Sequence, residues 1–265
     1  MVKALVTGGA GFLGRGLLRQ ASVLGWDISV FSRDENKQDE CRGQFPQARY
    51  ILGDIRDTDH LSAIMVGHDI VIHGAAIKFV DRAELNATET VSVNVLGSLS
   101  VIQAARSAGV ERVVGISTDK AVQPVNIYGA TKMAMERLFA EASIEGRTTF
   151  NCVRYGNVIG STGSVIPFFK RQADELGYVT ITDPNMTRFW MGIDEAVHLI
   201  DLALTKALPG AVVIPEVRAM RMKDVVSAVV PKDTEVKVIG IRPGEKMHES
   251  LLHHEESVRV VWHRD

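Results

Sequence analysis

The chain has 265 residues, of which 46% are hydrophobic and 23% charged, as is typical of a globular protein with a full hydrophobic core. The formal charge is −2 and there is no basic tract, so we expect a small-molecule partner, no nucleic acid and no anionic membrane. Cys41 and Cys152 lie far apart outside any CxxC pattern, and the N-terminus resembles neither a signal peptide nor a membrane span. These features predict a cytoplasmic protein without disulfides.

The first predicted elements are a strand at residues 3–7, a glycine-rich turn and a helix with apolar residues at helical spacing. Glycines at 9, 11 and 14 fit G-x-G-x-x-G, and those at 8, 11 and 14 fit the related G-x-x-G-x-x-G. Such a turn lets the backbone approach a pyrophosphate and aims a helix N-terminus at its charge. We therefore predict dinucleotide contacts from Gly8, Ala10, Gly11, Phe12, Leu13 and Gly14.

The end of the second predicted strand, at residues 27–31, bears on the choice of dinucleotide. It is followed by Ser32, Arg33 and Asp34. An acidic residue there would hold the ribose hydroxyls of NAD, whereas Ser and Arg suit the 2′-phosphate of NADP. Arg33, together with Lys37, favours NADP; if Asp34 takes the usual acidic role, the cofactor is NAD.

Two more strands are predicted at residues 50–54 and 69–73, and a long helix at about 87–108. Strands alternating with helices predict an α/β fold with a Rossmann-like, doubly wound parallel sheet, which binds ligands at the carboxyl ends of its strands. At those ends we expect an adenine edge at Asp54 and Ile55, and close backbone approach at Gly74, Ala75 and Ala76. Lys78 follows them and is expected to reach the cleft.

The stretch after the fifth predicted strand, at residues 112–117, carries the residues best suited to catalysis. Tyr128 and Lys132 are four apart on a predicted helix, so they share one face. An ammonium group beside a phenol stabilises the phenolate, so we expect Lys132 to lower the pKa of Tyr128 and make it a base for a substrate hydroxyl. Asp119 and Lys120 supply a second acid and base.

The remaining chain predicts a sixth strand at 149–153, helices at 193–207 and 222–230, and polar loops at 154–167, 183–190 and 241–246. Arg188 and Arg242 lie in the last two loops and could clamp a diphosphate, because guanidinium donors match phosphate oxygens in pairs. His248 and Glu249 suggest a zinc-protease motif, but position 252 is Leu, so H-E-x-x-H fails and we predict no metal site.

Several of these strings together resemble the extended short-chain dehydrogenase/reductases, and within them the inverting, 5-epimerising UDP-N-acetylglucosamine 4,6-dehydratases of polysaccharide biosynthesis. The resemblance covers roughly residues 3–252. Its most specific parts are Phe31-Ser-Arg-Asp-Glu35, Ser117-Thr-Asp-Lys-Ala121, Tyr128-Gly-Ala-Thr-Lys132, Val153-Arg-Tyr-Gly-Asn-Val158, Asp183-Pro-Asn-Met-Thr-Arg-Phe-Trp190 and Gly240-Ile-Arg-Pro-Gly-Glu-Lys246.

The resemblance implies an NADP-binding Rossmann domain at 1–160, to which 190–215 return, and a small substrate-binding lobe from 161–189 and 216–265. It implies oxidation at C4 with Tyr128 as base, removal of the C5 proton by Lys120, protonation of the departing C6 hydroxyl by Asp119, and hydride return to C6. It adds Ser117 and Val158 to the cofactor contacts, beside Tyr128 and Lys132. The implied UDP-N-acetylhexosamine contacts are Lys78, Thr118, Asn157, Ile166, Arg188, Arg242 and Glu245.

The resemblance also implies a homo-oligomer, a dimer or higher, and it leaves other functions open. A UDP-sugar 4-epimerase would need only Tyr128 and Lys132, and a retaining 4,6-dehydratase would carry an Asp-Glu pair where this chain has Asp119 and Lys120. A scaffold that binds NADP without catalysis is the alternative outside enzymes. A base role for Lys120 requires a neutral amine, which we expect burial and the cations Lys78 and Lys132 to favour.

Overall fold

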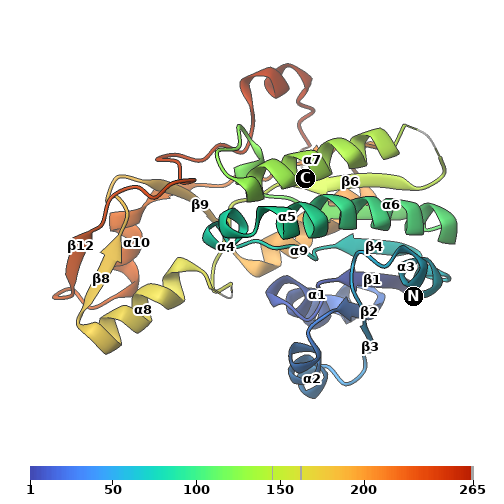
Figure 1. The fold of residues 1–265 in the computed structure, drawn as a ribbon, viewed down its shortest axis with the longest axis horizontal. Helices are drawn as coiled ribbons and strands as arrows, with labels where there is room; N and C mark the ends of the chain where they lie inside the picture. Colours follow the sequence, from blue (N-terminus) through green and yellow to red (C-terminus); the bar gives the residue numbers. More distant parts are fainter. Residues whose placement is uncertain (145, 162, 264–265) are drawn as a thin grey trace.

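A computed structural model describes residues 1–144, 146–161 and 163–263 of the chain. Its centre is a seven-stranded sheet in the order β10-β6-β5-β4-β1-β2-β3, in which all neighbouring strands are parallel (Figure 1). The strands are β1 (Val2–Thr7), β2 (Trp26–Ser32), β3 (Arg49–Leu52), β4 (Ile70–His73), β5 (Arg112–Ile116), β6 (Thr149–Val153) and β10 (Val212–Val213). The strands predicted before residue 154 are confirmed to within three residues at each end.

Helices cover both faces of this sheet, because successive strand residues point to opposite sides. Ala4 and Val6 of β1 pack in one cluster of buried residues, with α1 (Phe12–Leu24), α2 (Glu35–Gln44) and α9 (Ile193–Thr205). Leu5 packs in the other, with α3 (Thr58–Met65), α6 (Gly97–Ala108) and α7 (Ile127–Ala142). The predicted doubly wound α/β fold is confirmed.

The strand order reverses beside β1, which lies between β2 and β4. A doubly wound sheet opens a crevice at the carboxyl ends of the strands at such a reversal. The ends of β1 and β4 are tied there, since the Thr7 hydroxyl lies 2.9 Å from Nδ1 of the fully buried His73. His73 is therefore a packed residue that fixes the crevice floor.

The helix predicted at 87–108 is one run of three parts: α5 (Ala87–Val91), a π-helical turn η1 (Ser92–Leu96) and α6. It follows the short helix α4 (Val80–Leu85). A π-turn adds one residue to a helical turn and rotates the side chains around it, and it often marks a functional site. Here it turns Asn94, which is almost fully buried, toward the loop after β4.

A small lobe stands beside the sheet, at the left of Figure 1. Its core is a separate cluster built from α8 (Val165–Leu176), β8 (Tyr178–Ile181) and α10 (Met222–Val229). Strand β12 (Glu235–Val238) pairs with β8, and β7 (Asn157–Val158), β9 (Thr187–Met191) and β11 (Ala219–Arg221) form another sheet.

Two of the polar loops predicted from the sequence are therefore partly wrong. Residues 154–167 include β7 and the first turn of α8, and residues 183–190 run into β9. These short strands pair with segments distant in sequence, and no local pattern reveals such partners. Two 3₁₀ turns, η2 (Asp119–Ala121) and η3 (His254–Arg259), complete the described elements.

Among residues 1–144, 146–161 and 163–263, no helix combines the length and the apolar character needed to cross a bilayer. The same residues contain no group of three or more His, Cys, Asp or Glu side chains arranged to hold a metal ion.

Candidate active site

The glycine turn after β1 packs closely against its neighbours, as only residues without a side chain allow. Gly8 has φ +70°, and a Cβ there would lie 2.9 Å from the Ala75 backbone nitrogen. A Cβ on Gly14 would overlap the carbonyl of Gly9, so this glycine lets α1 pack against the turn. Gly11 is the N-cap of α1 and aims the helix N-terminus at the crevice. The turn therefore fits a dinucleotide.

A cavity of about 430 Å³ adjoins this turn. It lies between the ends of β2 and β3 and beside the loop after β4. The predicted contacts Gly8, Ser32, Arg33, Lys37, Ile55, Ala75 and Ala76 line it, together with Phe31, Asp34, Gly53 and Val93. Sequence reasoning named Asp34 as the alternative ribose contact but missed Phe31, Gly53 and Val93, of which Val93 reaches the cavity from the π-turn.

Charged side chains lie at the rim of this cavity. Lys37 pairs with Asp34 at 2.6 Å, and Asp34 also caps α2 by accepting from the Lys37 backbone N–H. Arg33 lies 3.4 Å from Asp54, whose pKa is lowered well below its usual value by the hydrogen bond from Arg56. Asp34 is thus engaged in capping α2. Ser32 is the last residue of β2, and Arg33 follows it directly.

The chain leaves β5 at Ser117 and enters the turn η2, which holds the predicted acid and base. Thr118 donates a hydrogen bond to Oδ1 of Asp119 at 2.9 Å. Asp119 is fully buried, and its Oδ2 has no hydrogen-bond partner among the described residues. Lys120 places its Nζ 3.0 Å from Asp119 Oδ1. An acid, a base and one unused carboxylate oxygen therefore occupy a single turn.

Gly129 brings the helix of Tyr128 against this turn. A Cβ on Gly129 would overlap the carbonyl of Lys120, so only glycine permits the approach. Asn126 caps α7 by accepting from the Gly129 N–H at 2.7 Å. The start of α7 and η2 are thereby locked together, with Tyr128 beside Thr118 and Asp119.

The pKa shifts of Tyr128 and Lys132 differ from the sequence expectation. Burial, with the negative charge of Asp119, raises the pKa of Tyr128, whereas we expected Lys132 to lower it. Burial lowers the pKa of Lys132 to about 8, and its amine donates to Met135 Sδ at 3.6 Å. The expected lowering was wrong because desolvation of the phenol and the negative charge of Asp119 both raise its pKa, and the one lowering influence is the hydrogen bond with Thr118.

The loop after β4 is held by the π-turn. Asn94 accepts from the Ile77 N–H at 2.8 Å and donates to the Ile77 carbonyl and to the Thr131 hydroxyl, both at 3.0 Å. Lys78 follows, with its amine 5.5 Å from the centre of the Phe79 ring. Lys78 is exposed, and partial desolvation of its amine lowers the pKa.

The segment after β12 packs against the start of α7 and the residue that follows η2. Asn126 donates to the Gly244 carbonyl at 2.8 Å, and Lys246 donates to the Val122 carbonyl at 2.6 Å. Glu249, which is 7% exposed, lies 3.6 Å from the Lys120 amine. Among the described residues, Lys120 therefore forms ion pairs with the two carboxylates Asp119 and Glu249.

The predicted diphosphate clamp is not assembled in this structure. Arg188 is buried and donates to the backbone carbonyls of Thr187 and Met247, which joins β9 to the C-terminal segment. Arg242 is exposed, and its backbone N–H donates to the Glu245 carboxylate at 3.3 Å. Asn157 lies in β7 and Ile166 in the first turn of α8.

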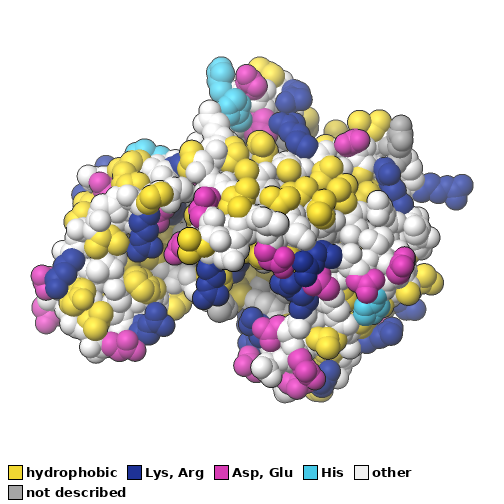
Figure 2. Space-filling view, viewed as in Figure 1, with side chains coloured by type: hydrophobic (Ala, Val, Ile, Leu, Met, Phe, Trp, Pro, Cys, Tyr) yellow, Lys and Arg dark blue, Asp and Glu magenta, His cyan; other side chains and the backbone are white. Residues whose placement is uncertain are grey.

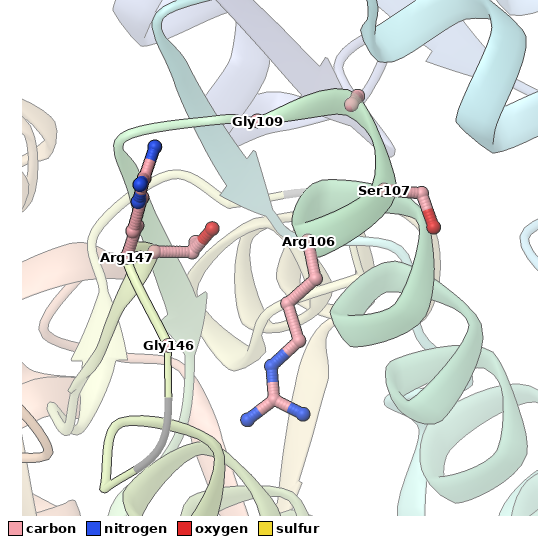
Figure 3. A pocket seen from close by; sticks show the side chains of 7 residues that line it. Arg106, Ser107, Gly109, Gly146 and Arg147 are labelled. Atoms are coloured by element: carbon pink, nitrogen blue, oxygen red, sulfur yellow. The ribbon is translucent and has the colours of Figure 1, made fainter.

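A second cavity, of about 560 Å³, lies at the opposite edge of the sheet, beside the amino ends of β5 and β6. Figure 3 shows Arg106 and Arg147 pointing away from one another there. Arg106 donates to the Ala142 carbonyl at 2.8 Å. The residues that line this cavity offer hydroxyls and guanidinium groups without a carboxyl or a phenol.

Comparison with known proteins agrees with this geometry. The family model described as "Polysaccharide biosynthesis protein" matches residues 4–265. The chain is 41% identical over 261 residues to the UDP-N-acetylglucosamine 4,6-dehydratase (inverting) of Campylobacter jejuni, an alignment that covers 96% of this chain and 78% of that protein. It is 36% identical over 278 residues to the UDP-glucose 4-epimerase of Rickettsia conorii, with 98% and 80% covered.

Solved structures share the fold. Pen from Bacillus thuringiensis matches with a TM-score of 0.92 and 37% identity over 97% of this chain and 85% of that one. The structure of DesIV from Streptomyces venezuelae, a dTDP-glucose 4,6-dehydratase with NAD and TYD bound, matches with a TM-score of 0.84. The identity is 23%, and the match covers 97% of this chain and 90% of that one, which shows likeness of fold. The chain therefore belongs to the polysaccharide biosynthesis protein family, among relatives of the inverting UDP-N-acetylglucosamine 4,6-dehydratases.

Proposed function

We propose that this protein is a nucleotide-sugar 4,6-dehydratase that acts on UDP-N-acetylglucosamine. The observation that carries the proposal is the pairing of Asp119 and Lys120 in one buried turn, packed through Gly129 against the helix of Tyr128. A 4-epimerase needs the tyrosine and a lysine but no second acid and base. The identity to a dehydratase of this type supports the same choice.

The proposed cycle moves protons between three side chains and the hexose. When bound, the dinucleotide accepts a hydride from C4 and returns it to C6. Tyr128 takes the proton of the C4 hydroxyl, and Lys132, one turn along α7, would offset the charge of the phenolate only after its amine leaves Met135 Sδ. Lys120 then removes the C5 proton, which the C4 ketone has made acidic. Asp119 protonates the C6 hydroxyl, which leaves as water.

Completion of the cycle requires a proton at C5 after the hydride has reached C6. Delivery from the face opposite to the one where Lys120 acted would invert C5 and give a UDP-2-acetamido-2,6-dideoxy-4-hexulose. The unpartnered Oδ2 of Asp119 supports its role, because a buried carboxylate oxygen without a donor is suited to a substrate hydroxyl.

We infer that the preferred cofactor is NADP, with NAD as the alternative. Asp34 is engaged in capping α2, while Arg33 and Lys37 line the cavity with Ser32. Guanidinium and ammonium groups there suit a 2′-phosphate. Ser117 and Val158 are the further contacts that we propose for the cofactor.

Replacing Arg33 with alanine should raise the KM for NADP by roughly 10- to 100-fold, because a charge-assisted hydrogen bond to phosphate contributes about 1.5–3 kcal/mol. The KM for NAD should change little. Initial rates with each dinucleotide measure both values. Arg19→Ala, at an exposed position of α1, is the matched control and should leave both unchanged. Equal losses with both cofactors would contradict a role for Arg33 in recognising the 2′-phosphate.

We propose that residues 1–160 and 190–215 form the Rossmann part, which binds the cofactor. The lobe formed by 161–189 and 216–265 is proposed to close over the sugar nucleotide. Figure 2 shows a notch between the lobe and the body of the protein. Lys78, Thr118, Asn157, Ile166, Arg242 and Glu245 are the side chains proposed to meet the substrate. Arg188 would join them only after exchanging its carbonyl partners for phosphate.

Self-association is a further part of this proposal. Figure 2 shows a band of hydrophobic side chains over α5, α6 and α7. Exposed apolar residues on the helical layer of this face include Leu85, Val91, Leu96 and Met133, and an exposed apolar patch favours association with a second copy.

A cytoplasmic location stays a prediction, which the two buried, unpaired cysteines support.

Incubation with UDP-N-acetylglucosamine and NADP in deuterated water tests the function. We expect a 4-keto product that is one water lighter than the substrate and carries deuterium at C5, seen by mass spectrometry and by a proton NMR time course. Formation of the C4 epimer without loss of water would instead establish the epimerase alternative, which the Rickettsia conorii relative raises. Binding of NADP without turnover would favour a scaffold.

A further inference from the structure

Glu249 brings a buried carboxylate from the C-terminal segment to the catalytic turn. Its Oε1 lies 3.6 Å from the Lys120 amine, and its Oε2 lies 3.3 Å from the Lys246 amine. The Glu249 side chain is 2% exposed, and that of Lys120 is 19% exposed. A carboxylate excluded from water between two amines interacts with them far more strongly than a surface pair would.

The position of Glu249 is fixed independently of Lys120. The Lys246 amine that contacts it also donates to the Val122 carbonyl at 2.6 Å, just after the turn η2. The segment is held a second time beyond Glu249, where Arg154 donates to the Leu251 carbonyl at 2.9 Å and pairs with Glu256 at 2.7 Å. Glu249 is therefore not needed to fasten the segment, so its burial against Lys120 calls for another explanation.

The Lys120 amine ends a flexible four-carbon chain, and two carboxylates define where it lies. Asp119 Oδ1 is 3.0 Å from it and Glu249 Oε1 is 3.6 Å from it. In the proposed reaction Asp119 must carry a proton to the C6 hydroxyl, and a protonated carboxyl holds an ammonium group weakly. A second carboxylate is needed to hold Lys120 while Asp119 is protonated.

We propose that Glu249 is the positioning residue for Lys120, an inference that rests on the proposed dehydratase function. Glu249 holds the amine in line with C5 of the substrate and stabilises the ammonium that forms when Lys120 takes the C5 proton. Asp119 is thereby released to act as the acid at the C6 oxygen. Lys246 keeps Glu249 in place, since it ties the same carboxylate to the Val122 carbonyl.

The test is Glu249→Gln, which keeps the size and the hydrogen-bonding capacity of the side chain but removes its charge. We expect the rate of C5 deuterium exchange to fall roughly 10- to 100-fold, the loss typical of a misplaced catalytic group. The rate of C4 oxidation, followed in a single turnover as the rise in absorbance of the reduced dinucleotide, should stay within twofold of wild type, because it depends on Tyr128. Glu249→Asp, which keeps the charge, should recover part of the exchange rate.

Glu255→Gln, at an exposed position of the same segment, is the matched control, and Tm and NADP affinity are measured for every variant. Equal losses of C4 oxidation and C5 exchange with a lower Tm would make Glu249 a purely structural residue and overturn the inference. Unchanged exchange in Glu249→Gln, with an active wild type, would overturn it without touching the proposed function. A wild type that releases no water would overturn both.

Discussion

Replacing Lys120 with methionine should lower the rate of C5 deuterium exchange by about 10²–10⁴-fold, the usual contribution of a general base, and should stop loss of water. The reason is that the variant keeps the length of the side chain and loses the group that accepts the C5 proton. NADP affinity should be unchanged, because the cofactor cavity is lined from other strand ends. Exchange by NMR and cofactor titration by fluorescence give the two measurements.

Lys120→Arg separates the charge of this residue from its basicity. Arginine can still pair with Asp119 and Glu249, but it does not lose its proton in proteins, so exchange should remain abolished while the fold is preserved. Lys206→Met, at the exposed end of α9, is the control for removing a lysine and should leave the rate unchanged. Undiminished C5 exchange in either Lys120 variant would remove the base role assigned to it.

The sequence was sufficient to predict the sheet and the order of its elements up to β6. Signals for these features are local: an apolar strand, glycines at fixed spacing and a helix follow one another directly from Lys3 to Leu24. The same holds for Tyr128 and Lys132, since helical periodicity alone puts them on one face. The overlap that a Cβ on Gly129 would make with the Lys120 carbonyl shows why the tyrosine is followed by glycine.

The features that sequence reasoning missed depend on contacts between distant segments. Glu249 lies 129 positions after Lys120, so no spacing rule connects them. The sign of the Tyr128 pKa shift is another case, because the degree of burial is a property of the packed fold. Arg154 is a third: it was noted only within a motif string, and its partners come from α7 and from η3.

Arg154 joins the sheet to the C-terminal segment through a buried network. Its guanidinium, in a residue that is 3% exposed, pairs with Glu136 of α7 at 2.6 Å and with Glu256 of η3 at 2.7 Å. Glu136 in turn accepts a hydrogen bond from Ser117, which lies two residues before the turn η2. The segment that carries Lys246 and Glu249 is thus fastened to the strand end that carries Asp119 and Lys120.

Replacing Arg154 with methionine should therefore cost about 3–5 kcal/mol in the free energy of unfolding, because two carboxylates are left without their partner in a buried site. The corresponding fall in Tm is roughly 6–20 °C for a chain of this size. Urea unfolding followed by circular dichroism measures the change. Arg218→Met, at an exposed position, is the control and should stay close to wild type. A variant with an unchanged Tm would show that the network does not hold the segment.

The acid dependence of stability gives an independent check on the same network. The hydrogen bond from Arg154 lowers the pKa of Glu256 from 4.5 to about 2. A carboxyl whose pKa is lower in the folded than in the unfolded state stabilises the fold at pH values above its unfolded-state pKa. The contribution of Glu256 should therefore be complete above about pH 4.5 and be lost as the pH falls toward 2. In Arg154→Met, the loss of stability between pH 4.5 and 2 that comes from Glu256 should disappear. The double variant Arg154→Met/Glu256→Gln should be more stable than Arg154→Met alone, because the second substitution removes one of the two unpaired charges. Stability that fell equally with acid in wild type and variant would place the loss elsewhere in the fold.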